Sequence, residues 1–429
     1  MAHLMRTGLN DCDGLTSRKH TSGWRPQRFR PLLATSLVTF GTRRLQPVGV
    51  TLGILCLVAI TAFGPATVPA ATGSIGLYVR DGVLMKDGSP YLGIGANYQT
   101  LFGKLLRNKD DTSSLENLAR LSKAGIPFIR YRACGFRPEN YQLYQQDRAE
   151  YFRRMDQVVH AAEQNNIGLI PSLFWRLATV SELLGENRDQ LGNPNSKAGR
   201  FIRQYTQEMV SRYKDSPAIW GWEFGAEANL GADLPNPGTR RAAGKLPDRN
   251  TAAVDRTRLT SAQLRAAYIL FANTVRKIDS TRIVESGTTL PRPAAWHLAH
   301  GEGWKRDTVE QGFSTLLDLT PDPMDVLSVH VYEKAKEHYP EAGGTQGVIG
   351  LVMKQAQAVR KPLFIGEFPV KDQAQTQEYL HAMEANRVPL SAFWVFDDPN
   401  EPKMNVDFDN ERSFVLDMVA KANQVLQGH

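Results

Sequence analysis

Two glutamates near the ends of apolar, strand-like runs are the strongest candidates for chemistry in this sequence. Glu227 closes the aromatic-rich run 218–227, and Glu367 closes the run 362–367. On a barrel of parallel strands, side chains at the carboxyl ends of the strands point into one mouth. Cleavage of a glycosidic bond needs one carboxyl group as proton donor and another as nucleophile or base. A lone glutamate is usually a solvated loop residue, but two in such positions predict a catalytic site.

Eight apolar runs with the length of strands recur along the chain and would position these side chains. They span residues 91–97, 127–132, 167–174, 218–227, 282–287, 326–332, 362–367 and 390–396. Amphipathic patterns separate them, and this alternation is typical of parallel βαβ units. We therefore predict a (β/α)8 TIM barrel, preceded by a short β-hairpin that turns at residues 80–82. A doubly wound open sheet is the alternative, but no Gly-x-Gly-x-x-Gly segment opens a helix.

Helices and loops are also predicted from local patterns. A capping box at Ser113–Glu116 starts one helix, and the other helical patterns cover 150–164, 199–213, 261–278, 348–359, 376–385 and 414–426. The long segments 230–258, 288–313 and 334–344 follow strands and are predicted to be loops. Loops on that face of a barrel build the walls of a substrate cleft.

The positive charge of the chain belongs to its first residues. The net charge is +7, and residues 1–46 hold eight Lys or Arg against two Asp, which accounts for +6. The remainder is nearly neutral, so the charge indicates no nucleic-acid partner. Two of the three cysteines precede residue 73, which leaves Cys134 without an intramolecular partner in a processed protein.

The N-terminal segment has the layout of a secretory signal. Arg43-Arg44 precedes an apolar run over 48–63, and Val68-Pro69-Ala70 resembles a cleavage site. We predict that residues 1–72 are a tail with a signal peptide, and that 73–429 form the catalytic domain. The domain would be secreted or periplasmic. An uncleaved membrane anchor, with the domain outside the cytoplasm, is the alternative, although the run is shorter than the roughly 20 residues that span a bilayer.

At this point the chain resembles the retaining glycoside hydrolases of clan A, most closely family 5. The resemblance covers residues 76–427 and rests on six segments in order. They are Val83–Asn97 at the first strand, Phe128-Ile129-Arg130, Trp222–Glu227, His330-Val331-Tyr332, Ile365–Phe368 and Phe393-Trp394. It implies an O-glycosyl hydrolase that cleaves β-linked glycosides of glucan or mannan type. Its partner would be an oligo- or polysaccharide, and no cofactor or metal is expected.

The resemblance also implies roles for the residues that match. Glu227 would be the acid/base, with a pKa raised by burial and by the neighbouring carboxylate, and Glu367 the nucleophile. Arg130 would keep Glu367 ionised or pair with Glu223, a structural carboxylate, or do both. We also expect substrate contacts, or contacts to the two glutamates, from four further residues: Asn97, His330, Tyr332 and Trp394.

One position departs from the family pattern. The residue before the acid/base is usually Asn, which binds the sugar 2-hydroxyl, whereas here it is Ala226. Two other functions therefore stay open: a weakly catalytic or non-catalytic sugar-binding barrel, and a transglycosylase. His297 and His300 are spaced like metal ligands, but no carboxylate cluster accompanies them in the sequence.

Overall fold

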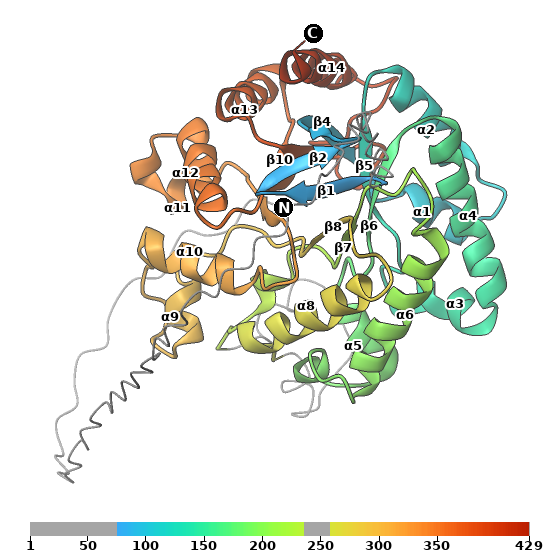
Figure 1. Ribbon diagram of the computed structural model, residues 1–429, viewed down its shortest axis with the longest axis horizontal. Coiled ribbons are helices and arrows are strands. Elements are labelled where there is room, and N and C mark those ends of the chain that lie inside the picture. Colours follow the sequence, from blue (N-terminus) through green and yellow to red (C-terminus); the bar gives the residue numbers. More distant parts are fainter. Residues whose placement is uncertain (1–74, 236–257, 429) are drawn as a thin grey trace, which may run out of the picture. The chain divides into compact units, whose positions relative to one another are not determined.

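The computed structural model describes residues 75–235 and 258–428. Eight parallel strands form a barrel with helices around it, which confirms the predicted TIM barrel (Figure 1). The strands are β4 (Gly93–Asn97), β5 (Phe128–Arg132), β6 (Gly168–Ser172), β7 (Gly221–Glu223), β8 (Ile283–Glu285), β9 (Leu327–His330), β10 (Leu363–Pro369) and β11 (Leu390–Trp394). Nearly every strand residue is buried, because a barrel strand faces the interior on one side and a helix layer on the other.

The predicted hairpin closes the amino-terminal end of the barrel. β1 (Leu77–Arg80) pairs with β2 (Val83–Lys86), which pairs with β3 (Ser89–Pro90). The amide of Leu77 donates to the carbonyl of Trp220, just before β7. Leu77 and Leu84 pack into an apolar cluster of residues at the amino-terminal ends of the barrel strands, including Phe128 and Trp220. The hairpin therefore acts as an apolar plug, and it leaves the opposite end of the barrel open for a site.

The longer helices match the amphipathic patterns. They are α2 (Ser113–Lys123), α4 (Arg148–Gln164), α6 (Lys197–Tyr213), α8 (Ser261–Arg276), α12 (Thr345–Ala358), α13 (Gln373–Asn386) and α14 (Phe414–Gln427). Short helices lie in the connections: α1 (Leu101–Arg107), α3 (Gln142–Gln146), α5 (Ala178–Leu184), α9 (Ala295–Ala299), α10 (Val309–Asp318) and α11 (Ala335–His338). Single 3-10 turns cover Pro138–Tyr141, Arg188–Gln190, Ala228–Gly231 and Pro340–Ala342.

Four local predictions were wrong. The predicted loop 334–344 contains α11 and the 3-10 turn Pro340–Ala342. The segment 288–313 is not simply a loop, because it contains α9 and the start of α10, whose Thr308 N-cap forms a capping box with Gln311. The predicted box at Ser113 does not form, and Thr112 stands at the N-cap of α2 without a side-chain cap bond. The strand that approaches Glu227 is also shorter than predicted, since β7 ends at Glu223.

The barrel has one seam. Within the described residues, no ladder of hydrogen bonds joins β8 to β9. One backbone hydrogen bond, from the amide of Asp325 to the carbonyl of Val284 at 3.0 Å, and side-chain hydrogen bonds bridge the seam instead. The carboxylate of Asp325 accepts the amide of Val284 at 2.9 Å, and the hydroxyl of Thr289 donates to the carbonyl of His330 at 3.3 Å.

The predicted tail, signal peptide and membrane anchor lie in residues 1–72, outside the described part of the chain. No helix among the described residues is long and apolar enough to cross a membrane.

Candidate active site

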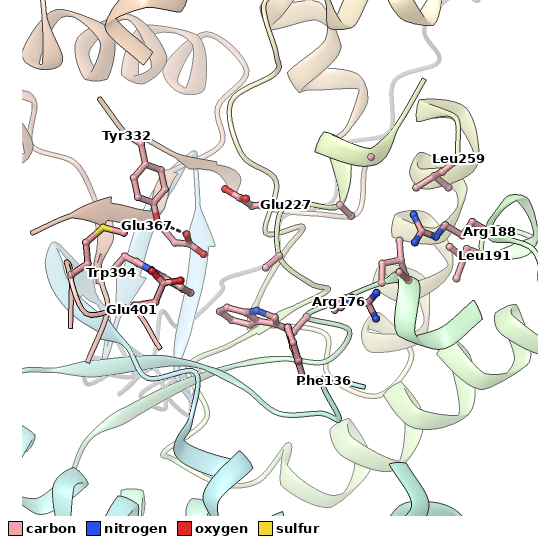
Figure 2. Close-up of a pocket in the computed structure, with 17 residues that line it drawn as sticks. Phe136, Arg176, Arg188, Leu191, Glu227, Leu259, Tyr332, Glu367, Trp394 and Glu401 are labelled. Atoms are coloured by element: carbon pink, nitrogen blue, oxygen red, sulfur yellow. Dashed lines mark hydrogen bonds between the residues drawn. The ribbon is translucent and has the colours of Figure 1, made fainter. Parts of the chain in front are cut away.

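Glu227 and Glu367 face one cavity at the carboxyl ends of the strands. Its volume is about 620 Å³. Figure 2 shows the two side chains on either side of this space, with Tyr332 beside Glu367. One oxygen of each carboxylate and one ring nitrogen of His330 all lie within 4.8 Å of one another. Retaining glycosidases place their two carboxyl groups about 5–5.5 Å apart, whereas inverting enzymes need roughly 6.5–9.5 Å.

Three side chains hold Glu367, which lies in β10 and is only 5% exposed. Arg130 Nη1 donates to Oε1 at 2.9 Å, and the Tyr332 hydroxyl donates to Oε2 at 2.7 Å. His330 Nδ1 lies 3.4 Å from Oε2. Burial and the charge of Glu367 raise the pKa of Tyr332 well above its usual value, so its hydroxyl stays a donor. These contacts orient the carboxylate of Glu367.

Glu227 lies beyond the end of β7, where the backbone turns. It adopts a left-handed conformation with φ of 50°, which is costly for a residue other than glycine and is typical of functional positions. Its amide donates to the carbonyl of Gly287 at 2.8 Å, and its Oε1 lies 3.0 Å from His330 Nδ1. About a third of the side chain, 35%, is exposed, toward the cavity. Glu227 is therefore the more accessible of the two carboxylates.

The expected rise in the pKa of Glu227 was wrong for the free protein. Burial does raise this pKa, but the hydrogen bond from His330 and its charge outweigh burial, and the net direction is downward. The sequence placed His330 near the two glutamates but did not show that its ring would bond to Glu227.

We predict that His330 sets the alkaline limit of activity. If Glu227 must be protonated to act, kcat/KM falls as pH rises through its pKa in the free enzyme. Replacing His330 by Phe removes the two largest influences that lower this pKa, and leaves burial, which raises it, opposed by the charge of Arg130 and the hydrogen bond of Thr289. The alkaline limb of a kcat/KM–pH profile should therefore move to higher pH, and less so for His330→Gln, which keeps a hydrogen-bond donor. The exposed His160→Gln is the control, and an unmoved limb in His330→Phe would contradict the prediction.

Arg130 is fully buried and joins Glu367 to the barrel core. Its guanidinium binds both oxygens of Glu223, with Nη2 at 2.9 Å from Oε1, besides its bond to Glu367. Both pairings considered from the sequence are therefore present. Burial lowers the pKa of Arg130, but the charges of Glu223 and Glu367 raise it further, so the cation is secure.

A second buried carboxyl group lies beside this cation. Glu285 pairs with Glu223 in the register of β7 and β8. Burial and the charge of Glu223 raise the pKa of Glu285 well above its usual value, while Arg130 holds the pKa of Glu223 down against burial. The pair thus consists of a neutral acid and a carboxylate, and one cation faces two anions, Glu223 and Glu367.

Asn97 and Trp394 lie close to the carboxylates but differ in what they offer a substrate. Asn97 is fully buried, accepts from Arg130 at 2.8 Å and donates to the carbonyls of Gly366 and Phe393. Its groups are occupied by protein, so we propose that it positions Arg130. Trp394 lines the cavity, is 9% exposed and stacks on Trp175, with ring centroids 6.1 Å apart.

Several cavity residues were not predicted from the sequence. Phe136, Arg176, Arg188, Leu259 and Glu401 all line it. They lie in connections that follow β5, β6, β7 and β11. Their position after the end of a strand is the sequence feature that could have indicated that they line the cavity. Figure 2 shows the cavity extending from Trp394 and Glu401 past Glu227 to Arg176 and Arg188.

His297 and His300, which are spaced like metal ligands, contact different partners in this fold. His297 binds Asp307 at 2.6 Å, and His300 stacks on Trp296. Among the described residues, only Glu227, His330 and Glu367 converge closely enough to share an ion. Arg130 and Tyr332 already occupy the oxygens of Glu367, so this trio suits proton transfer better than metal binding.

A TIM barrel whose mouth holds two facing carboxylates at this separation resembles the clan A retaining glycoside hydrolases in fold and in the arrangement of its site. The comparisons with known proteins agree with this class. A mannan endo-1,4-beta-mannosidase F of Aspergillus fumigatus is 29% identical over 182 residues, which are 37% of this chain and 40% of that one. A probable mannan endo-1,4-beta-mannosidase C of Aspergillus terreus is 34% identical over 23% of this chain and 26% of its own.

Solved structures extend the likeness over most of the fold. An endo-1,4-beta-mannanase from Rhizomucor miehei has a TM-score of 0.60 at 15% identity, covering 82% of this chain and all of its own. A glycoside hydrolase family 5 mannosidase from the same organism has a TM-score of 0.55 at 13% identity, covering 83% and 99%. No family model matches the chain. The chain spans less than half the length of the curated relatives it matches. The predicted resemblance to the family 5-like enzymes of clan A is confirmed.

Proposed function

We propose that this protein is a retaining β-glycoside hydrolase that cleaves a β-linked polysaccharide or oligosaccharide of mannan type. The convergence of Glu227 and Glu367, with Arg130 bound to Glu367, carries this proposal. Mannan is favoured over glucan because the relatives with sequence similarity are named as mannan endo-1,4-beta-mannosidases. The predicted secretion belongs to the same proposal, since such a polymer is met outside the cell.

The geometry supports a double displacement. Glu367 attacks the anomeric carbon while Glu227 gives its proton to the leaving oxygen, so the glycosidic bond breaks as a glycosyl ester forms. Glu227, now a carboxylate, removes a proton from water, which attacks the anomeric carbon, so that the bond to Glu367 breaks and its carboxylate is released. Arg130 and Tyr332 orient Glu367 before the first step and receive its charge again after the second.

The sugar-binding alternative is motivated by Ala226, which lines the cavity but offers no side-chain donor. The complete set of contacts around Glu367 does not favour this alternative, because a binding surface has no need of a buried, doubly hydrogen-bonded carboxylate.

Product stereochemistry is the decisive experiment. Mannan, glucan and the corresponding aryl β-glycosides are incubated with the protein, and the anomeric form of the first sugar released is followed by NMR. We expect a β-anomer from a β-linked mannan substrate. An α-anomer would exclude double displacement. If none of these substrates is hydrolysed, the result would support the binding alternative. Condensation products in the presence of acceptor sugar would indicate a transglycosylase.

A further inference from the structure

A second cavity of about 700 Å³ adjoins the first one and carries a different chemistry. The two cavities share Phe136, Trp175, Trp394 and Glu401. The second cavity does not include Glu227, and it continues over α1 and the segment after β5. A substrate that enters the first cavity therefore has a way to extend past the Trp175–Trp394 stack.

Two arginines of this second cavity lie close together without a carboxylate partner. An ideal Cβ on Gly103 would lie 2.8 Å from Arg132 Nη2 and 3.5 Å from Arg107 Nη1, so both guanidinium groups surround one point. Neither forms an ion pair with any of the described residues, and the buried Nε of Arg132 has no hydrogen-bond partner there. Glycine inside a helix reduces stability by about 1 kcal/mol relative to alanine. At position 103, within α1, the missing side chain leaves the space that the two arginine side chains occupy.

The acidic residues of the same cavity are already bound. Asp397 accepts from Lys104, and from Asn117 at 3.2 Å. The charge of Asp398 reaches Arg132, but its oxygens accept from Gln99 and Asn400. The other two carboxylates on the walls, Glu139 and Glu401, are at least partly exposed to solvent.

Two adjacent guanidinium groups therefore lack an anion. Burial lowers the pKa of Arg132, and the charge of Arg107 lowers it too. A partly desolvated pair of like charges is unfavourable until an anion binds. The planar guanidinium fork matches a carboxylate in bidentate geometry. Arg132 also lies over the Phe136 ring, at 4.9 Å from its centroid, which fixes the plane of its guanidinium.

We propose that this second cavity binds a carboxylate on the substrate, so that the chain acts on a β-linked glycan containing uronic acid units. The proposal rests on the proposed function, which also sets the direction of the substrate. The leaving sugar must lie against the proton donor Glu227, on the side of Arg176 and Arg188. The sugars on the other side of the cleaved bond then extend past Trp394, and one of them presents its carboxylate to Arg107 and Arg132.

Equilibrium binding tests this assignment without turnover. The full chain carrying Glu227→Gln is titrated with a β-1,4-linked manno-oligosaccharide, and with the same oligosaccharide after oxidation of its primary hydroxyl groups to carboxylates. We expect the oxidised form to bind at least tenfold more tightly at low salt. Arg107→Gln and Arg132→Gln should each remove most of this preference, and higher salt should weaken it. Arg265→Gln, an exposed residue of α8, is the control and should leave the preference unchanged.

The outcomes separate the two proposals. Equal or weaker binding of the oxidised form, or a preference that both arginine variants retain, would overturn the uronate assignment. Tighter binding of an oligosaccharide sulfated at the same positions would also overturn it, in favour of sulfate. Because Arg107 is exposed, its variant stays informative if Arg132→Gln does not fold. Hydrolysis of both substrates by the unaltered chain tests the proposed function separately, and its absence leaves the binding comparison readable.

Discussion

Glu367→Ala is expected to reduce hydrolysis of an activated aryl β-glycoside by at least about 10⁴-fold, because it removes the group that forms the covalent intermediate. The alanine also leaves space beside the anomeric carbon that a small anion can enter. Added azide should therefore restore part of the activity and give a glycosyl azide of inverted, α, configuration. Burst kinetics and product NMR measure both effects.

Glu116→Gln is the matched control for this experiment, since Glu116 is exposed on α2 and should leave the rate unchanged. Circular dichroism checks that Glu367→Ala keeps its fold. Equal turnover by the alanine variant and the unaltered chain would refute the role of Glu367. A lost rate that azide does not restore, in a folded variant, would argue against the covalent intermediate.

Arg130→Met is expected to have the largest effect on stability. It leaves Glu223 and Glu367 buried without their cation, and removing one partner of a buried ion pair typically costs about 3–5 kcal/mol. Urea unfolding monitored by tryptophan fluorescence measures this loss in the free energy of unfolding. Activity should fall as well, because Glu367 loses the donor that orients it.

Arg130→Lys separates charge from geometry. Lysine keeps the positive charge but not the fork that binds Glu223 and Glu367 together, so its loss of stability should be smaller than that of the Met variant. Arg265→Met, at an exposed position, should stay within about 0.5 kcal/mol of the unaltered chain. If Arg130→Met is as stable as this control, the buried network does not support the fold.

The architecture could be predicted because barrel strands carry a local signal. Seven of the eight apolar runs contain an observed strand, the run 362–367 overlaps β10, which continues to Pro369, and the hairpin turns where its Asp-Gly pair predicts. The ends of elements were less predictable. The backbone leaves β7 at Glu223 because the following residues bond to Trp175 and Gly287 on neighbouring strands' loops. Such contacts depend on the register between strands, which a single strand's sequence does not contain.

The sequence predicted those residues of the candidate site that lie at or near the ends of strands. Glu367, Arg130, His330 and Tyr332 meet as the resemblance implies, and their catalytic and binding roles remain proposals. What the sequence did not reveal is which partner each one takes. The His330 contact that reverses the expected shift in the pKa of Glu227 spans two elements, and so does the pairing of Glu285 with Glu223. Both depend on how neighbouring strands are arranged in the barrel.

The seam between β8 and β9 separates the two carboxylates mechanically. On one side of the seam, the amide of Glu227 is bonded to Gly287, which follows β8. On the other side, Glu367 lies in β10, which pairs with β9. One backbone hydrogen bond, from Asp325 to Val284, crosses the seam below the site, and beside the two carboxylates the crossing contacts among the described residues involve side chains, the imidazole of His330 among them. At the level of the carboxylates the gap can therefore widen or narrow slightly without breaking a ladder of backbone hydrogen bonds. Glu227, as proton donor, must follow first a departing sugar oxygen and then an incoming water. The missing ladder between β8 and β9 allows this movement in an otherwise rigid barrel.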